Sequence, residues 1–186
     1  MANTLLLRLV WLWPCLPWLF GWGPAAMLRW QGDAAATRAG EYWRLFSASW
    51  VHLDLQHALL NTTSLLLVCW LCPPARRAGL WPLAVLPALL LPLLEAGPFA
   101  GASGVAYAWA MWLLLGWPAG RWRWLAVLLL VGKVAWQSGQ GSLLAGHPVA
   151  HGAHWLGLLL ATLLHLVCQI AVRPTPGKRQ PGQAGA

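Results

Sequence analysis

The chain has 186 residues, of which 59% are hydrophobic and only 9% are charged. Because soluble domains carry about 25% charged residues, this composition excludes an ordinary water-soluble globule and predicts a membrane protein. The 12 Lys and Arg residues outnumber the 4 Asp and Glu residues, giving a net charge of +8. The basic residues fall between apolar runs, which is typical of membrane orientation signals, so we expect a lipid bilayer and no nucleic acid as partner.

Residues 5–23 form the first apolar run, and Arg8 lies near its start. A basic residue, an apolar core and the small residues Ala25 and Ala26 are also features of a secretory signal peptide. The run contains two prolines and five aromatic residues, however, and it is long for the apolar core of such a peptide. We therefore predict a retained first membrane span, with the signal peptide as the alternative.

The next segment, residues 24–51, mixes charged residues with aromatic ones. It is too polar to span a bilayer and too aromatic for a free linker, so we expect short helices that lie at the membrane interface. Trp43 and Arg44 are expected to anchor this first loop rather than to touch a substrate.

Five further apolar runs follow, over residues 53–71, 80–94, 102–117, 124–136 and 149–172. Together with the first run they predict an all-α polytopic membrane protein with six transmembrane helices, in which residues 1–172 form one domain. The remaining residues, 173–186, are rich in proline, glycine and basic side chains, and we predict that they form a disordered cytoplasmic tail.

Six spans would place both ends of the chain on the same side of the membrane. That side would carry most of the basic residues: Arg8, Arg76, Arg77, Arg121, Arg123, Arg173, Lys178 and Arg179. The opposite side would carry only Arg29, Arg38 and Arg44, all in the first loop. Because positive charge accumulates on the cytoplasmic side, both termini are predicted to be cytoplasmic. Lys133 fits neither side, and it either snorkels toward the headgroups or faces a polar interior.

Polar side chains of three spans lie at their exterior ends. Ser103, within Gly101-Ala102-Ser103-Gly104, begins the fourth span. His57 and Asn61 begin the second span, and His154 begins the sixth. Ionisable side chains inside spans usually have a function. We therefore expect these four side chains to meet at one shallow depth on the exterior face.

The fourth and sixth spans carry the candidate nucleophile and its base. Gly104 and Gly157 are small enough to let the two helices approach closely. Close approach would bring the Ser103 hydroxyl within hydrogen-bond reach of His154, which would accept its proton and later donate it to the leaving amine. No acidic residue belongs to either span, so the sequence predicts a catalytic Ser–His dyad rather than a triad.

Stabilisation of the oxyanion would come from three donors. His57 and Asn61 are four residues apart and therefore share one helix face. Their side chains, together with the Ser103 backbone N–H, could donate to the oxyanion that forms when Ser103 attacks a carbonyl. Gly101 would leave backbone room for that carbonyl. Tyr107, one turn beyond Ser103, is either core packing or an aromatic plane that orients the imidazole of His154.

Four motifs occur in order between about Glu41 and Ala161: Trp43-Arg44, His52-x4-His57-x3-Asn61, Gly101-Ala-Ser103-Gly104 followed by Tyr107, and Ala153-His154-x2-Gly157-Leu158. Together they resemble the rhomboid family of intramembrane serine proteases. The resemblance implies a rhomboid-like bundle, a Ser103–His154 dyad, an oxyanion site at His57 and Asn61, and Tyr107 stacked on the His154 ring. Ala161 departs from the family pattern, which often has glycine at this position.

The short chain and the run Trp-Arg-Leu-Phe…Val-His-Leu…His-Ala-Leu-Leu-Asn further resemble the rhombosortase branch. That branch is associated with cleavage of C-terminal glycine-rich sorting tails of exported bacterial proteins. The resemblance implies a membrane-anchored protein substrate with a glycine-rich or helix-weakened segment. It also implies a bacterial inner-membrane location with an active site open to the periplasm.

Other functions stay open on the sequence alone. A membrane zinc protease would be expected to carry His-Glu-x-x-His, which this chain lacks, so we expect no metal and no other cofactor. Cys69-x-x-Cys72 lacks the second pair of a zinc site, and we interpret it as structural, with redox chemistry as the alternative. A non-catalytic rhomboid-like protein that binds membrane helices is one alternative function. A small transporter that uses His154 and Lys133 as proton sites is another.

The remaining histidines are left outside the predicted catalytic set. His52 lies near the membrane interface, where it is either a supporting partner of the site or solvated. His147 and His151 lie near the loop before the sixth span and are expected to be solvated. His165 lies nearer the other end of that span and is expected to pack or to contact headgroups.

Overall fold

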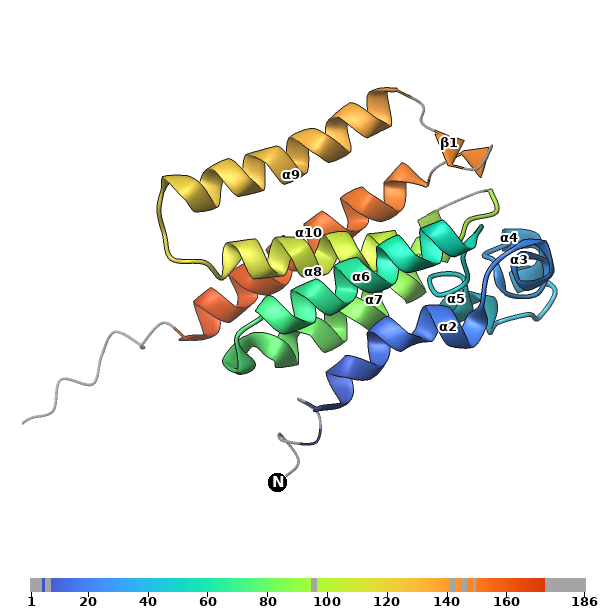
Figure 1. The fold of residues 1–186 in the computed structure, drawn as a ribbon, viewed down its shortest axis with the longest axis horizontal. Coiled ribbons are helices and arrows are strands. Elements are labelled where there is room, and N and C mark those ends of the chain that lie inside the picture. The colour runs from blue at the N-terminus through green and yellow to red at the C-terminus, as the bar shows by residue number, and fades with distance from the viewer. Residues whose placement is uncertain are drawn as a thin grey trace, which may run out of the picture.

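The computed structural model describes residue 5 and residues 8–94, 97–140, 143–144, 147–148 and 150–172. Helices dominate this part of the chain, which confirms the all-α class (Figure 1). The helices are η1 (Val10–Cys15), α2 (Leu16–Phe20), α3 (Pro24–Trp30), α4 (Ala34–Arg38), α5 (Arg44–Ser47), α6 (Leu55–Leu71), η2 (Pro74–Gly79), α7 (Leu80–Leu94), α8 (Ser103–Leu115), α9 (Arg121–Gly139) and α10 (His151–Val172). Two short antiparallel strands, β1 (Leu143–Leu144) and β2 (His147–Pro148), join α9 to α10. The predicted disordered tail, 173–186, lies outside the described residues.

The helices follow the predicted apolar runs, with one difference at the start of the chain. The first run is a 3₁₀ segment, η1, that continues into the short α2 and not a single α-helix. Pro14 lies inside η1 and Pro17 lies in the first turn of α2. Because proline has no backbone N–H and blocks the preceding turn, two prolines in this run interrupt regular α-helical bonding.

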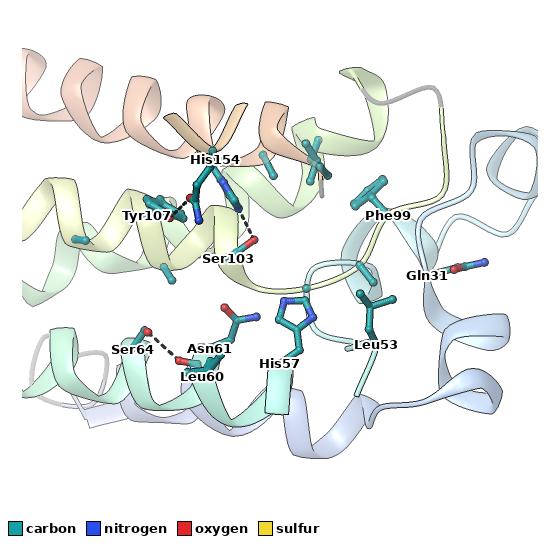
Figure 2. A pocket seen from close by; sticks show the side chains of 18 of the residues that line it. Gln31, Leu53, His57, Leu60, Asn61, Ser64, Phe99, Ser103, Tyr107 and His154 are labelled. Carbon is teal, nitrogen blue, oxygen red and sulfur yellow. Dashed lines mark hydrogen bonds between the residues drawn. The ribbon is translucent and has the colours of Figure 1, made fainter. Parts of the chain in front are cut away.

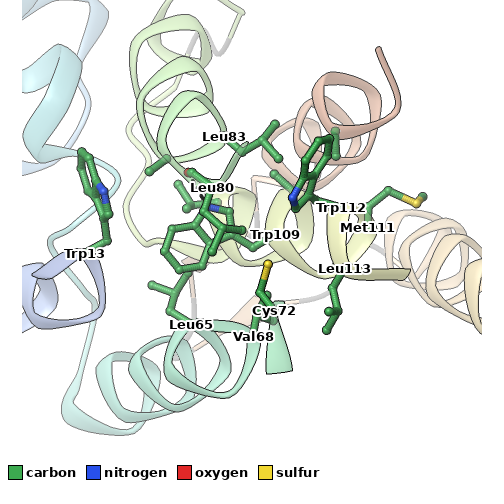
Figure 3. Packing of buried hydrophobic residues seen from close by; sticks show 14 of the residues in the cluster. Trp13, Leu65, Val68, Cys72, Leu80, Leu83, Trp109, Met111, Trp112 and Leu113 are labelled. Atoms are coloured by element: carbon green, nitrogen blue, oxygen red, sulfur yellow. Dashed lines mark hydrogen bonds between the residues drawn. The ribbon is translucent and has the colours of Figure 1, made fainter. Parts of the chain in front are cut away.

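Helix α8 lies at the centre of the bundle. It packs against α6, α7 and α10, while α9 lies along one edge in contact with α8 and α10 (Figure 1). Trp109, which is fully buried, is surrounded by apolar side chains of the neighbouring helices, including Leu65 and Leu80 (Figure 3). Its indole N–H donates to the Leu80 carbonyl at 2.9 Å, so the one polar atom of this ring is satisfied inside the core.

Small residues set the contact between α8 and α10. A Cβ added to Gly104 would lie 2.9 Å from the Ala153 carbonyl oxygen, and one added to Gly157 would overlap the Gly104 carbonyl oxygen. Ala161 is fully buried further along the same helix. The prediction that Gly104 and Gly157 allow close approach of the two helices is therefore confirmed.

Backbone hydrogen bonds connect the first loop to the segments that precede α6 and α8. Gly23 N–H donates to the His52 carbonyl, and His52 N–H donates to the Gly21 carbonyl. Gly32 and Phe99 exchange a reciprocal pair of bonds at 2.9 and 3.2 Å. Backbone atoms of the first loop thus hold both the segment before α6 and the segment before α8 in place.

Arg44 fixes the fold of the first loop. Its guanidinium is largely buried and donates to Glu41 at 2.6 Å, to the Gln31 carbonyl at 2.9 Å and to the Leu28 carbonyl at 3.0 Å. These bonds join the end of α3 to the segment around Glu41, as expected for an anchoring residue. The neighbouring Trp43 is half exposed.

The outer surface of the bundle supports membrane association. Within the described residues, one helical stretch, His151–Ala171 in α10, is both long and apolar enough to cross a membrane. Large apolar side chains are exposed along the outer helices, including Leu125, Leu128, Leu129 and Trp136 on α9 and Leu159, Leu163, Leu166 and Ile170 on α10. Continuous apolar surface of this kind is avoided by soluble monomers and is favourable against lipid.

The Cys69-x-x-Cys72 pair is buried at the end of α6. Both thiols are free, and both side chains belong to the apolar core cluster. Figure 3 shows Cys72 in this cluster. Burial among apolar side chains is typical of inert structural cysteines. This placement favours the structural interpretation of the pair over the redox one.

Candidate active site

Ser103 is the first residue of α8. The chain reaches it through Gly101, whose φ of +112° is open to glycine and strained for other residues. Ala102 follows as the N-cap without a side-chain capping bond. The first backbone N–H groups of a helix have no acceptor within that helix. The Ser103 backbone N–H is therefore available to a ligand that also contacts the Ser103 hydroxyl.

His154 lies beside Ser103 across the α8–α10 contact. Its Nε2 atom is 3.0 Å from the Ser103 hydroxyl oxygen (Figure 2). The ring is 5% exposed, and among the described residues its Nδ1 atom has no hydrogen-bond partner. A neutral imidazole protonated on Nδ1 would accept the serine proton on Nε2. This geometry is that of a dyad, because no described carboxylate contacts the second nitrogen.

Tyr107 packs on the face of the His154 ring. The two ring centroids are 4.4 Å apart with an interplanar angle of 35°. The phenol oxygen of Tyr107 also contacts the Lys133 ammonium group and donates to the Gln137 side-chain oxygen at 3.0 Å. Tyr107 is thus held at both ends, which restricts the imidazole to the orientation that faces Ser103.

His57 and Asn61 project from α6 toward the start of α8 (Figure 2). A Cβ built on Gly101 would lie 2.9 Å from His57 Nε2 and 3.6 Å from Asn61 Nδ2, so both polar groups converge on that glycine. Asn61 is 6% exposed, yet its Nδ2 atom has no partner among the described residues. A buried donor without an acceptor is costly, which points to an acceptor that arrives with a ligand.

Gly101 has a steric role that was not predicted, and the predicted role stays a prediction. We expected it to leave backbone room for a substrate carbonyl. A Cβ at this position would lie 2.6 Å from the Cε1 atom of His57, so the glycine makes room for that imidazole. Its positive φ is a second reason for glycine, because the turn must aim Ser103 at α10.

His52 is fully buried in the loop before α6, so the alternative of a solvated His52 is wrong. Its Nδ1 atom lies 2.9 Å from the Trp50 carbonyl, which can only accept, so Nδ1 carries the proton. The Nε2 atom is then free to accept the Ala102 N–H at 3.4 Å. Burial lowers the pKa of His52 from 6.5 to about 3. This neutral ring therefore supports the residue that precedes Ser103.

The other histidines lie around the edge of this arrangement. His151 is half buried, with its ring centroid 5.7 Å from that of His154, and its solvation stays a prediction. His165 packs edge-on against Trp112 with centroids 6.2 Å apart, as expected for a packing residue. The side chain of His147 lies outside the described part of the structure.

Ser103 and His154 open onto a cavity of about 830 Å³ between α6, α8, α9 and α10. The polar side chains that line it are Gln31, His57, Asn61, Ser64, Ser103, Tyr107, Lys133, Gln137 and His154. Apolar side chains such as Leu60 and Leu91 form much of the remaining wall. No acidic side chain occurs among its described lining residues. The cavity is large enough for a peptide segment together with water.

Comparison with protein-family models and with curated proteins finds no match to this chain. Among the described residues, no three His, Cys, Asp or Glu side chains are grouped so that they could hold a metal ion. The groups that could do chemistry at this site are the Ser103 hydroxyl hydrogen-bonded to the His154 imidazole, and the Asn61 Nδ2 donor beside them, which has no partner among the described residues.

Proposed function

We propose that this protein is an intramembrane serine endopeptidase of the rhomboid type. The observation that carries the proposal is the 3.0 Å contact between Ser103 Oγ and His154 Nε2 inside a cavity. A part-buried serine–imidazole pair next to free backbone and amide donors has the parts that acyl transfer requires. Isolated serines in membrane helices usually serve packing, but packing does not require a buried imidazole and an unpartnered amide.

In the proposed reaction, Ser103 Oγ attacks the carbonyl carbon of the scissile peptide bond while His154 Nε2 takes the hydroxyl proton. The oxyanion of the tetrahedral intermediate accepts from the Ser103 N–H, His57 and Asn61, which are worth about 3 kcal/mol each in such sites. His154 then donates its proton to the leaving amine, and an ester on Ser103 remains. Water, deprotonated by His154, hydrolyses this ester and restores the hydroxyl.

We further propose that six helical segments span the membrane: η1 with α2, and then α6, α7, α8, α9 and α10. Helix α8 has 13 residues and is about 20 Å long, whereas a bilayer core is about 30 Å thick. The Ser103 end of α8 would therefore lie below the membrane surface, within reach of water from the cavity. In this proposal both termini are cytoplasmic, which the charge asymmetry of the loops supports, and the cavity opens to the periplasmic side of a bacterial inner membrane.

The substrate that fits this site is a membrane-anchored protein with a glycine-rich or otherwise helix-weakened segment. Peptide carbonyls inside a transmembrane helix are protected by their own hydrogen bonds, so the segment must unwind before Ser103 can attack. Glycine lowers the cost of that unwinding. A C-terminal glycine-rich sorting tail, as cleaved by the rhombosortase branch, has these properties.

The proposal is tested by cleavage of a tagged membrane substrate with a glycine-rich juxtamembrane segment. Wild-type protein, Ser103→Ala and His154→Ala are expressed at matched levels in the same cells. We expect product from the wild type and a loss of at least about 10³-fold in both variants. Equal product from all three proteins would contradict the protease function and would favour a helix-binding role. Labelling of Ser103 by a fluorophosphonate probe, absent from Ser103→Ala, identifies the nucleophile independently of any substrate.

A further inference from the structure

Lys133 is a cation in the wall of the cavity that the proposed reaction does not use. It lies on α9, and its ammonium group contacts the Tyr107 hydroxyl and lies 3.2 Å from the Gln137 side-chain oxygen. Its Nζ atom is 4.9 Å from the centroid of the Tyr107 ring. Because the other part of Tyr107 packs on His154, Lys133 stands about one aromatic ring away from the catalytic pair. It therefore lines the cavity, with a side chain that is exposed in the structure.

The charge of Lys133 has no counterion among the described residues. An ammonium group has three N–H donors, and Lys133 uses two of them, both on neutral oxygens. Three of the four acidic residues of the chain are described, and each is engaged elsewhere. Asp33 caps α4, Asp54 caps α6 and Glu41 pairs with Arg44. Helix α9 thus presents one unneutralised positive charge, with one free donor, to the cavity.

We propose that Lys133 is a binding subsite for a carboxylate of the substrate, a proposal that rests on the peptidase function above. A carboxylate that enters the cavity would supply the missing counterion and accept the third N–H of the ammonium group. A hydrogen bond between two charged groups is stronger than one between neutral groups. The carboxylate is either an Asp or Glu side chain near the scissile bond or the free C-terminus of a short peptide.

The position of Tyr107 explains how such a subsite would act on specificity. Tyr107 is bonded to Lys133 and Gln137 at its hydroxyl, and its ring lies against His154. A carboxylate held by Lys133 would therefore lie at a restricted span of extended chain from the reacting carbonyl. Substrates with an acidic group at that span would be held with the scissile bond at Ser103, and other substrates would lose this anchor.

Binding to the full-length Ser103→Ala protein in detergent micelles tests the subsite without depending on catalysis. The probes are fluorescent glycine-rich peptides with amidated C-termini, in which one Asn is replaced by Asp at each position in turn. A matched Asn peptide with a free C-terminus separates the two sources of carboxylate. We expect at least one carboxylate peptide to bind about tenfold tighter than its amide counterpart, as measured by fluorescence anisotropy, since charged hydrogen bonds contribute at this level.

Variants then assign the preference to Lys133. In the Ser103→Ala background, Lys133→Met should bind the carboxylate and amide peptides with equal affinity. Lys133→Arg should keep the preference for the carboxylate peptide. Arg38→Met removes the same charge from an exposed site on α4 and should leave the ratio unchanged. Equal affinity of the carboxylate and amide peptides for the Lys133 protein overturns the proposal, even if no Lys133 variant folds. An unchanged ratio in folded Lys133→Met also overturns it. Failure of the wild type to cleave any peptide would contradict the peptidase function and leave these affinities measurable.

Discussion

Gly157 of α10 packs directly on the backbone of α8 at Gly104, so closely that a side chain at Gly157 would overlap the Gly104 carbonyl oxygen. The same added Cβ would lie 3.0 Å from the Ala108 backbone nitrogen. This contact lies one turn beyond His154 and one residue beyond Ser103 in their respective helices. The distance between Ser103 and His154 is therefore set by backbone contact between two helices.

Substitution of Gly157 should uncouple the catalytic pair. Gly157→Ala must push α10 away from α8, and overpacking of this kind costs about 1–3 kcal/mol of stability. We expect a lower melting temperature and a loss of peptidase activity larger than the loss of folded protein. Gly132→Ala on α9 is the matched control, because nothing lies within 4 Å of its added Cβ, and alanine favours the helix by up to about 1 kcal/mol. Comparable melting temperatures and activities in the two variants would contradict this account of the α8–α10 contact.

Asn61 should contribute to catalysis without contributing to stability. Its Nδ2 atom is buried and has no partner among the described residues, so Asn61→Ala removes an unsatisfied donor from the resting protein. We expect kcat to fall about 10²–10³-fold, as for other oxyanion donors, while the melting temperature is unchanged or rises. Single-turnover kinetics and thermal unfolding of the same preparation measure the two effects. A variant that loses stability and activity together would show that Asn61 is a structural residue.

The ring and the hydroxyl of Tyr107 should have separable effects. Tyr107→Phe keeps the surface that packs on His154 and loses the bonds to Lys133 and Gln137. Tyr107→Ala removes both. We expect Tyr107→Ala to lower kcat about 10²-fold, because imidazole orientation is lost, and Tyr107→Phe to retain most of kcat. Both variants are compared on a peptide without carboxylate groups, so that carboxylate binding at Lys133 does not affect kcat. If both variants lose kcat equally, the hydroxyl and not the ring is what the reaction needs.

His52 should make the folded state sensitive to acid. Burial lowers its pKa to about 3, so below pH 6.5 the unfolded chain binds a proton on this ring that the folded chain does not bind. The free energy of unfolding should therefore fall as the pH drops from 6.5 toward 3, by up to about 1.4 kcal/mol per pH unit from this residue. Above pH 6.5 this dependence should vanish.

The replacement His52→Gln tests this contribution because glutamine keeps an acceptor for the Ala102 N–H and does not titrate. Melting temperatures in detergent are compared between about pH 4 and pH 7, where the variant should show the shallower decline. Parallel declines in the two proteins would assign the acid sensitivity to other residues.

The sequence predicted the members of the candidate site better than their contacts. The sequence could place four side chains together: Ser103, His154, His57 and Asn61. The number of predicted spans and the charges of the loops put all four at the exterior ends of their spans. The buried bonds of His52 could not be predicted. They combine a local contact with the Trp50 carbonyl and a long-range contact with the Ala102 N–H, which the fold brings to the same ring. The contact of Lys133 with Tyr107 depends on the rotation of α9, which its largely apolar sequence does not determine.

The first run shows a different limit. Its composition predicts a span, but the two prolines decide that the local backbone begins as a 3₁₀ segment. Hydrophobicity sets the length of such a run, whereas the missing N–H groups set its geometry. For the same reason, Gly101 could be recognised as special from the sequence, yet its positive φ and its contact with His57 required coordinates.

The bonds between the first loop and the segments before α6 and α8 have a consequence for variation among relatives of this protein. The Gly32–Phe99 pair and the Gly21, Gly23 and His52 bonds are all made by main-chain atoms. Side chains of the first loop other than Arg44 and the glycines at 21, 23 and 32 can therefore change while the approach to Ser103 keeps its course, provided that no proline removes one of the donors. We expect the sequence of the first loop to vary rapidly among relatives while its backbone path is kept.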